Sequence, residues 1–369
     1  MSWLAIPAVL AGCYYGIAFA SALARIARRT ERDTGFTPPV SILKPVYGRD
    51  PGFYESIRSH ARQDYPAYEI LFGSRMPDDP ARQDVDRLAR EFPTIPIRWM
   101  SISETAPNGK VATLVELARA ARHEILLVND SDILVEPRYL RDVVAPLAGP
   151  AVGLVTCLYR AAGDSFAARF EALGIATEFA PGVLVARTLG IADFALGSTM
   201  VFRREQLRAI GGFEALREYL ADDYQLGRRI AEGGYRIAFA GMVVETRLSA
   251  RTLAGAWRHQ VRWARTVRLS KPGGYLGSVV THATLWAVVA LLGGHPRIAL
   301  AALAIRMAAG LACGAGVLRD PEVLRMTPWI PLRDLWGFAI WITALRGRSV
   351  EWRGEHLRLS PDGRILDSR

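Results

Sequence analysis

Three long stretches of this sequence carry almost no charge, and they constrain the fold more than any other feature. Residues 1–24 contain no charged side chain, and 273–294 contain no Lys, Arg, Asp or Glu. Residues 298–318 contain a single charged side chain, Arg306. Because about 20 apolar residues in a helix span a bilayer, we predict a transmembrane anchor at 1–24 and a transmembrane hairpin formed by the other two stretches.

Charged residues next to these stretches predict their orientation. A cleaved signal peptide is the alternative for 1–24, because 20–22 read Ala-Ser-Ala, but the stretch is long and no basic residue precedes it. Arginines that follow it favour a cytoplasmic location for the next segment; they are Arg25, Arg28, Arg29 and Arg32. A shorter apolar stretch, 329–345, is interrupted by Arg333 and Asp334 and either crosses the membrane or lies at its interface.

The tail at 346–369 favours a cytoplasmic end for the chain, which would make 329–345 interfacial or re-entrant. Its arginines are Arg346, Arg348, Arg353, Arg358, Arg364 and Arg369.

Composition agrees with a globular domain that carries membrane segments. The 369 residues are 50% hydrophobic, with a mean hydropathy of +0.12, which excludes a disordered chain. The net charge of +10 is concentrated at the membrane flanks, which argues for a lipid bilayer as partner and against nucleic acid. Three distant cysteines argue against a disulfide scaffold and against structural zinc; they are Cys13, Cys157 and Cys313.

Residues 38–248 alternate short apolar runs with helical patterns. This alternation predicts an α/β fold with a mostly parallel sheet and helices on both faces. We expect strands at 40–43, 68–73, 97–100 and 124–128, and helices at 52–62, 84–91 and 110–122. Ligands of such sheets bind beyond the carboxyl ends of the strands, where Asp79 and Asp130 fall. The glycine patterns of dinucleotide-binding and P-loop proteins do not occur in the sequence.

Asp130 and Asp132 directly follow the strand expected at 124–128. Alternate residues of an extended segment point the same way, so both carboxylates can face one site. Their hard oxygen ligands suit Mg²⁺ or Mn²⁺. A turn or a helix N-cap is the alternative, because Asp and Ser are common in both.

Asp222 and Asp223 open a helical pattern, YLADDYQLGRR at 219–229. Acids at this position often act only as an N-cap that also interacts with the helix dipole. The functional alternative is a general base, a carboxylate that accepts a hydroxyl proton.

Several cations and one aromatic side chain are candidates for phosphate and sugar binding. His259, Arg262 and Trp263 share one face of an expected helix, which is also typical of a basic amphipathic helix on a membrane surface. Arg fits phosphate oxygens in a bidentate manner. Lys44 and Lys110 are ordinary surface lysines unless the nearby acids bind a diphosphate.

Six short motifs in order resemble the ceramide glucosyltransferase family (glycosyltransferase family 21-like), including the bacterial hopanoid glycosyltransferases. The motifs are Ser41-Ile42-Leu43-Lys44-Pro45, Pro77-Asp78-Asp79-Pro80-Ala81, Asn108-Gly109-Lys110, Asn129-Asp130-Ser131-Asp132, Ala221-Asp222-Asp223-Tyr224 and His259…Arg262-Trp263. Each motif is loose by itself, but the six in order together with the membrane segments cover nearly the whole chain.

The resemblance implies a GT-A fold and an inverting transfer from a UDP-sugar. It assigns Asp79 to the uridine part of the donor, Asp130 with Asp132 to the metal and diphosphate, and Asp223 to the catalytic base. Arg262 and Trp263 match a signature written (Q/R)xxRW, whose first position is here His259. The Gln-Asp expected before Pro77 is replaced by Arg75-Met76.

The expected organisation is an anchor at 1–24, a cytoplasmic GT-A domain with an interfacial helix at 25–271, a membrane region at 272–345 and a basic tail at 346–369. The family implies an integral membrane enzyme, with a bacterial inner membrane as the expected location. The expected donor is a UDP-sugar, with UDP-glucose favoured, and the acceptor is a membrane lipid. Alternatives are an N-acetylglucosamine transfer to a hopanoid, a polyprenyl-phosphate or polysaccharide glycosyltransferase, and a non-enzymatic membrane-anchored binding protein.

Overall fold

The computed structural model describes residues 3–27, 35–352 and 355–368. Packing divides the chain into two units. The sheet unit comprises 30–159, 192–247 and 363–369, and the helical unit comprises 1–29, 160–191 and 248–362. These boundaries differ from those expected from sequence, because 160–191 packs with the C-terminal helices. Five arginines used above to predict orientation lie outside the described residues: Arg28, Arg29, Arg32, Arg353 and Arg369.

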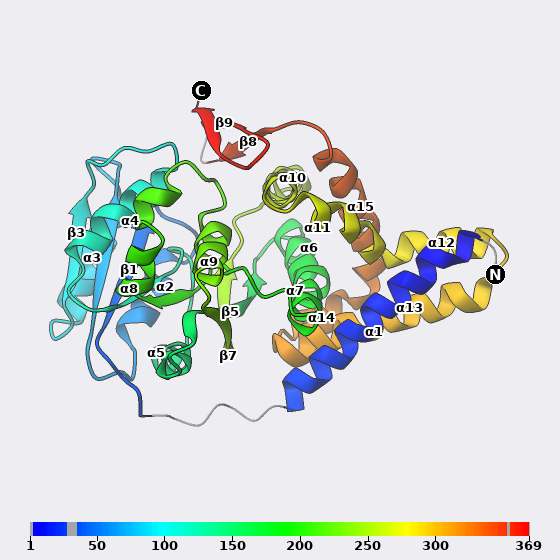
Figure 1. Ribbon diagram of the computed structural model, residues 1–369, viewed down its shortest axis with the longest axis horizontal. Coiled ribbons are helices and arrows are strands. Elements are labelled where there is room, and N and C mark those ends of the chain that lie inside the picture. Colours follow the sequence, from blue (N-terminus) through cyan, green and yellow to red (C-terminus); the bar gives the residue numbers. More distant parts are fainter. Residues whose placement is uncertain (1–2, 28–34, 353–354, 369) are drawn as a thin grey trace. The chain divides into compact units, whose positions relative to one another are not determined.

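The sheet unit is built on seven strands in the order β3-β2-β1-β4-β6-β5-β7 (Figure 1). The strands are β1 (Val40–Val46), β2 (Tyr68–Ser74), β3 (Ile97–Ser101), β4 (Ile125–Val128), β5 (Val152–Ala162), β6 (Met200–Arg203) and β7 (Arg236–Arg247). β1 pairs in parallel with β2 and β4, and β2 pairs in parallel with β3. β6 is antiparallel to β4 and β5, so the parallel order expected from sequence holds for β1 to β4 and not for β6.

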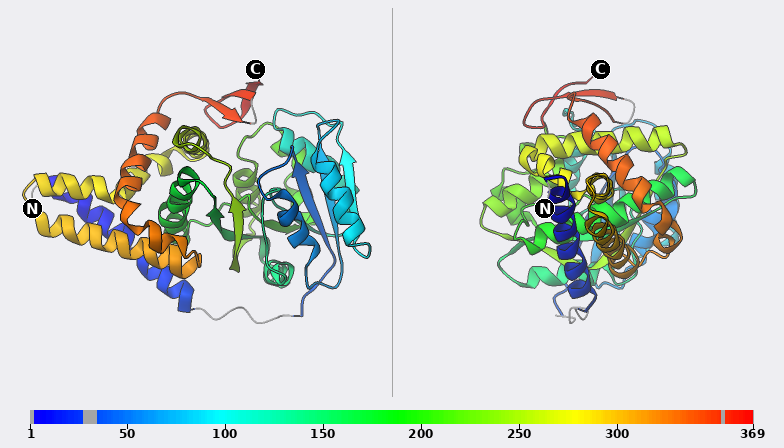
Figure 2. Two further views of the ribbon diagram at one scale, coloured as in Figure 1. Left: turned by 180° about the vertical axis from the view of Figure 1, so that it is seen from behind. Right: turned by 90° about the vertical axis from the view of Figure 1, so that its right-hand side faces the viewer.

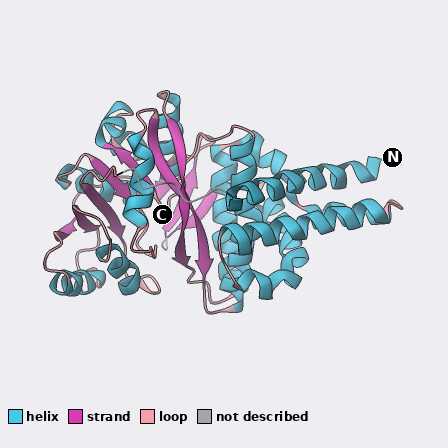
Figure 3. Ribbon diagram, turned by 90° about the horizontal axis from the view of Figure 1, so that it is seen from below, coloured by secondary structure: helices cyan, strands magenta, loops and turns pink. Residues whose placement is uncertain are grey.

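Helices cover both faces of this sheet, as predicted (Figure 3). They are α2 (Phe53–Ala61), α3 (Ala81–Glu91), α4 (Gly109–Ala120), α5 (Tyr139–Val144), α8 (Arg204–Ala209) and α9 (Asp222–Glu232). Ile42 of β1 shares one buried cluster with Ile57 of α2 and Leu88 of α3. On the opposite face, a Cβ on Gly73 would lie 2.9 Å from Thr113 of α4, so the glycine permits close packing of that helix.

The helical unit contains the apolar stretches. Its helices are α1 (Ile6–Ala27), α6 (Phe166–Gly174), α7 (Ala180–Thr188), α10 (Leu253–Ser270), α11 (Pro272–Gly277), α12 (Ala283–Leu292), α13 (Pro296–Leu311), α14 (Glu322–Met326) and α15 (Ile330–Ala344). A π-helical turn, Ile175–Phe179, joins α6 to α7, and a second, Ala312–Val317, extends α13. Figure 2 shows α1, α12 and α13 side by side.

Among the residues that the structure describes, two helical segments are long and apolar enough to cross a membrane, Trp3–Ala27 and Pro296–Val317. They match the predicted anchor and the second arm of the predicted hairpin. The first arm differs from the prediction, because Pro272–Thr281 and Ala283–Leu292 meet at 53°. α15 has 15 residues, fewer than the roughly 20 of a spanning helix, and it packs against α10 and α12.

The segment expected as a basic tail contains strands. β8 (Ser349–Trp352) and β9 (Glu355–Leu359) pair antiparallel in the helical unit. In the sheet unit, β10 (Ile365–Ser368) begins with a hydrogen bond from the Ile365 amide to the Glu218 carbonyl. Alternating apolar residues such as Leu357 and Leu359, both buried, explain why this segment is extended.

An ion pair in the interior of the helical unit joins two of its apolar helices. Arg306 of α13 is fully buried, and its Nη2 lies 2.6 Å from Oδ1 of Asp334 on α15. The Thr284 hydroxyl of α12 donates to the same carboxylate at 2.7 Å. Arg306 and Asp334 therefore compensate each other's charge, and together with Thr284 they link three helices.

Asp334→Ala should destabilise the helical unit strongly, because it leaves the Arg306 guanidinium buried without its counter-charge. Removing one partner of a buried pair typically costs about 3–5 kcal/mol. Thermal unfolding in detergent checks this, with Glu218→Ala as the control, since the Glu218–Arg364 pair is exposed. The double variant Arg306→Met with Asp334→Leu should recover most of the loss. Wild-type stability of Asp334→Ala would contradict this role.

Candidate active site

The sheet unit places its candidate site residues at one edge of the sheet. β1, β2 and β4 are parallel, so their carboxyl ends lie at the same edge. Lys44 lies near the end of β1, Asp79 follows β2, and Asp130 follows β4. α4 and α9 bring Lys110 and Asp222 into ionic contact with this edge from their first turns.

Lys110 joins two of the candidate acids. Its Nζ lies 2.8 Å from Asp130 Oδ1 and 3.3 Å from Asp222 Oδ2. Although burial opposes its charge, Asp130 and Asp222 raise the pKa of the Lys110 ammonium above its usual value. The Asn108 side chain caps α4 by accepting from the Lys110 and Val111 amides, and this fixes where the lysine side chain leaves the helix.

Asp223 and Asp130 approach each other across Gly197. The Gly197 amide donates to Asp223 Oδ2 at 3.0 Å. A Cβ on Gly197 would lie 3.1 Å from Asp223 Oδ2 and 3.6 Å from Asp130 Oδ2. The absence of a side chain at this position therefore leaves space beside both carboxylates. The sequence predicts only that Gly197-Ser198-Thr199 lines the acceptor side, and an isolated glycine in a loop gives no signal of a place beside two acids.

Neither Asp222 nor Asp223 is the N-cap residue of α9, although both lie in its first turn, where the helix dipole favours acids. Ala221 is the N-cap residue, and its side chain makes no capping hydrogen bond. Burial, followed by the charge of Asp222, raises the pKa of Asp223 to about 6. Burial also raises the pKa of Asp222, although Lys110 opposes the shift. A carboxylate with a pKa near neutrality is suited to general-base catalysis.

The Asp130–Asp132 segment is a turn, the alternative that the sequence left open, and not an extended segment. β4 ends at Val128 and residues 131–132 form the turn. Lys44 is fully buried and donates from Nζ to the Asp130 carbonyl at 3.0 Å, and this hydrogen bond stabilises the turn. Asp132 accepts a hydrogen bond from Thr246 of β7. Burial, followed by the charge of Asp130, raises the pKa of Asp132 to about 6.

Asp79 holds two loops together. Its Oδ2 accepts from the Ser74 hydroxyl at 2.6 Å and from the Gly48 amide at 2.9 Å. Its Oδ1 accepts from the Ala81 amide at 2.9 Å. The side chain is buried, and these bonds link the loops after β1 and β2. The uridine contact assigned to Asp79 stays a prediction.

The carboxylate oxygens of Asp130 and Asp132 are of the kind that hard divalent ions prefer, and a metal at this pair stays a prediction. In the described part of the chain, no three His, Cys, Asp or Glu side chains gather as a metal site. Mg²⁺ is commonly held by one or two carboxylates together with substrate phosphates and water. The Asp130 side chain is 46% exposed. Its Oδ1 contacts the Lys110 ammonium, and its Oδ2 faces the space that Gly197 leaves.

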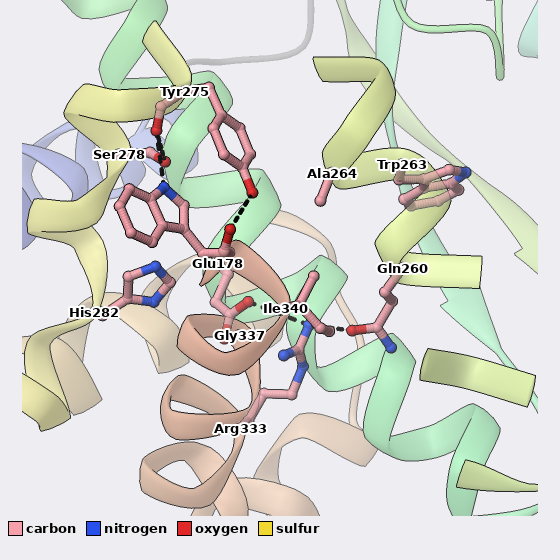
Figure 4. Close-up of a pocket in the computed structure, with 11 residues that line it drawn as sticks. Glu178, Gln260, Trp263, Ala264, Tyr275, Ser278, His282, Arg333, Gly337 and Ile340 are labelled. Carbon is pink, nitrogen blue, oxygen red and sulfur yellow. Dashed lines mark hydrogen bonds and ion pairs between the residues drawn. The ribbon is translucent and has the colours of Figure 1, made fainter. Parts of the chain in front are cut away.

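The signature residues lie on α10, in the helical unit. The His259 ring lies 4.7 Å from the Trp263 ring between centroids, which confirms that these two share a helix face. His259 Nδ1 bonds the buried carboxylate of Glu171. Trp263 lines a pocket of this unit together with Gln260 (Figure 4). The roles of His259, Arg262 and Trp263 in substrate binding stay predictions.

Comparison with known proteins identifies the family. The sequence profile of "Glycosyl transferase family 21" matches residues 4–365. The chain belongs to glycosyltransferase family 21. The resemblance inferred from the six motifs is thereby confirmed.

Curated relatives of this family 21 protein are ceramide glucosyltransferases. Ceramide glucosyltransferase 1 of Caenorhabditis elegans is 29% identical over 227 residues, covering 61% of this chain and 48% of the relative. Ceramide glucosyltransferase 3 of the same organism is 28% identical over 246 residues, covering 65% of this chain and 53% of the relative. The chain thus spans about half the length of these relatives.

A solved structure confirms the fold class. The mannosyltransferase PcManGT from Pyrobaculum calidifontis, in complex with GDP-Man and Mn²⁺, matches with a TM-score of 0.56 and 21% identity. The match covers 93% of this chain and 99% of that chain. The family 21 protein therefore has the predicted GT-A fold.

Gly197→Ala should weaken binding of UDP with Mn²⁺ about tenfold or more, a change of about 1.4 kcal/mol. The added methyl group would crowd the Asp223 and Asp130 oxygens. The shift in thermal unfolding temperature on titration with UDP and Mn²⁺ measures this. Gly241→Ala is the matched control, because a Cβ there meets nothing within 4 Å. Equal binding by both variants would show that the space at Gly197 is not used.

Proposed function

We propose that this protein transfers a sugar from a UDP-sugar, with UDP-glucose as the favoured donor, to a hydroxyl of a membrane lipid, with inversion at the anomeric carbon. The observation that carries the proposal is the gathering of Asp130, Asp222 and Asp223 around Lys110 and Gly197. Family 21 membership and the ceramide glucosyltransferase relatives support the same reaction class.

Asp223 is the proposed catalytic base. A neutral alcohol is a weak nucleophile, so its proton must leave as its oxygen attacks the anomeric carbon. The amides of Gly197 and Tyr224 donate to the Asp223 carboxylate at 3.0 and 2.7 Å. These bonds hold the side chain in place, and its raised pKa lets it accept a proton near neutral pH. A single displacement of this kind inverts the anomeric centre.

Cations stabilise the charge that develops on the leaving UDP. Lys110 is the cation of the acid cluster, and the first turn of α4 offers additional positive potential. We assign Arg262 to the same task on the strength of the signature motif, with Trp263 beside a sugar or lipid. Mg²⁺ or Mn²⁺ at Asp130 and Asp132 would supply Lewis-acid stabilisation of the diphosphate.

The lipid acceptor is proposed from the membrane segments. Trp3–Ala27 and Pro296–Val317 are the candidate spans, and the arginines after the first span favour a cytoplasmic catalytic domain at a bacterial inner membrane. Labelled UDP-glucose and UDP-N-acetylglucosamine, each offered with a ceramide, a hopanoid and a polyprenyl phosphate, distinguish the acceptor classes. A protein that binds UDP and glycosylates none of them would contradict the proposal.

Asp223→Asn should lower turnover by about 10²–10⁴-fold, the usual contribution of a general base. UDP binding should persist, because the amide keeps an oxygen that accepts from Gly197. Product formation in a detergent assay measures turnover, and the thermal shift with UDP verifies the fold. Asp78→Asn is the matched control, since Asp78 is exposed beside Asp79. Near-normal turnover of Asp223→Asn would remove the base assignment.

Turnover should fall about tenfold for each pH unit below about 6, because Asp223 is then protonated and cannot accept the acceptor proton. Lys110→Met should move this acid limb to higher pH, since the ammonium lowers the pKa of Asp223. The profile of kcat/KM against pH is the measurement. Glu232→Gln, at the other end of α9, should leave the limb in place. An unchanged limb in Lys110→Met would separate Lys110 from the base.

A further inference from the structure

The helical unit contains a pocket of about 190 Å³ that the proposed transfer has not used. Its walls come from α10, α11 and α15, from Ser278 and His282 between α11 and α12, and from the π-helical turn at Ile175–Phe179 (Figure 4). Aromatic and aliphatic side chains form its apolar part: Trp263, Tyr275, Ile340 and Trp341. This combination of a concave apolar wall with a few polar groups is typical of a small-molecule site.

Polar side chains in this pocket have hydrogen-bonding atoms that the protein leaves unpartnered. Gln260 is 7% exposed, and its Oε1 accepts from Arg333 Nη2 at 2.9 Å, whereas its Nε2 has no partner. Arg333 Nε and Nη1, His282 Nε2 and Glu178 Oε1 also have none. Because a buried polar group without a partner costs about 1–3 kcal/mol, so many in one pocket indicate a ligand that pairs with them.

The backbone around the pocket is irregular where the polar groups lie. His282 occupies the break at which Pro272–Thr281 and Ala283–Leu292 bend by 53°. Glu178 lies in the π-helical turn, a feature often found at functional sites. In membrane proteins, interrupted helices are tolerated where they line a cavity. These interruptions therefore support a binding site independently of the unpartnered atoms.

Charge in the pocket favours an uncharged ligand. Arg333 Nη2 lies 3.2 Å from Glu178 Oε2, so the two charges compensate each other. Figure 4 shows the Arg333 guanidinium between Glu178 and Gln260. The unpartnered atoms include donors, on Gln260 and Arg333, and an acceptor, on Glu178. A hydroxyl group both accepts and donates, and it satisfies both kinds of atom without adding charge.

We propose that this pocket binds the head group of an uncharged, hydroxyl-bearing lipid, with the hydroxyl between Glu178, Arg333 and Gln260. The inference rests on the proposed function only for identifying this lipid with the acceptor. Gly337 leaves room in the site because it has no side chain. A Cβ there would lie 3.2 Å from both Glu178 carboxylate oxygens and 3.4 Å from Arg333 Nη1.

Photolabelling of the full chain tests the pocket without requiring turnover. The protein is placed in phosphatidylcholine nanodiscs with a diacylglycerol that carries a diazirine beside its hydroxyl, and labelled peptides are identified by mass spectrometry. Labelling should concentrate on peptides of α10 and α15. Unlabelled diacylglycerol should compete about fivefold better than its methyl ether, the difference expected for about 1 kcal/mol of hydrogen bonding.

Two variants keep the test falsifiable. Gly337→Leu should reduce this labelling about fivefold or more by filling the site, and Gln260→Met should reduce it by removing one donor. Gly16→Leu is the control, because a Cβ on that glycine of α1 meets nothing within 4 Å. Uniform labelling of all apolar helices, wild-type labelling of Gly337→Leu, or better competition by phosphatidic acid would each overturn the proposal.

A parallel titration with UDP and Mn²⁺ separates this inference from the proposed function. Gly337→Leu should keep the wild-type thermal shift, which also shows that the variant is folded. A protein that is labelled in the pocket but shows no shift with UDP retains the lipid site and loses the transferase proposal. The reverse result retains the transferase proposal and removes the lipid site.

Discussion

The contact of one ammonium group with two carboxylates organises the candidate active site. Asp130, Asp222 and Asp223 would repel one another at the edge of the sheet, and burial adds to that cost. Lys110 lies within 2.8 Å of Asp130 and 3.3 Å of Asp222, and it offsets part of this repulsion. Burial first, and then the remaining repulsion, raise the pKa values of Asp222 and Asp223. An acidic cluster with incomplete compensation favours both the binding of a further cation and the uptake of a proton, which are the two properties that a sugar transfer from a nucleotide diphosphate requires.

The helical unit also contains buried charges, and they pair with opposite charges at two places, Arg306 with Asp334 and Arg333 with Glu178. Arg306 donates to Asp334 from Nε and Nη2, and Thr284 donates to the same carboxylate, while Nη1 of Arg306 has no hydrogen-bond partner among the described residues. One residue before Asp334, Arg333 is shared between Glu178 and Gln260 and keeps donors without partners. Neighbouring positions on α15 thus serve a structural cross-link and a polar pocket. The second site lies in a pocket and gathers unpartnered atoms from four side chains, whereas the first has one such atom, and this supports assigning a ligand to the second site.

Much of the fold could be predicted from patterns that depend on local chemistry. β1, β2 and β4 are short apolar runs, and α2 to α4 have clear helical periodicity, so their locations were expected. The acids that follow the strands were also expected to matter, since parallel strands end at a common edge. The antiparallel direction of β6, the bend at His282 and the pocket beside Gln260 depend on contacts between residues far apart in the chain, which periodicity does not encode. The place of Gly197 beside the acids was not predicted for a similar reason: it depends on the space that the missing side chain leaves between segments far apart in the chain.

Of the 46 lysines and arginines in the sequence, only three are lysines: Lys44, Lys110 and Lys271. Two of them contact Asp130. Lys44 has no exposed surface and donates to the Asp130 carbonyl, whereas the Lys110 side chain is 16% exposed and contacts the Asp130 carboxylate. Reagents that modify primary amines therefore have very few targets in this chain, and one of those targets is in ionic contact with the acid cluster. Acylation requires the unprotonated amine, so the carboxylates that raise the pKa of Lys110 also protect it, and burial protects Lys44; Lys271 is then the lysine that such reagents modify first.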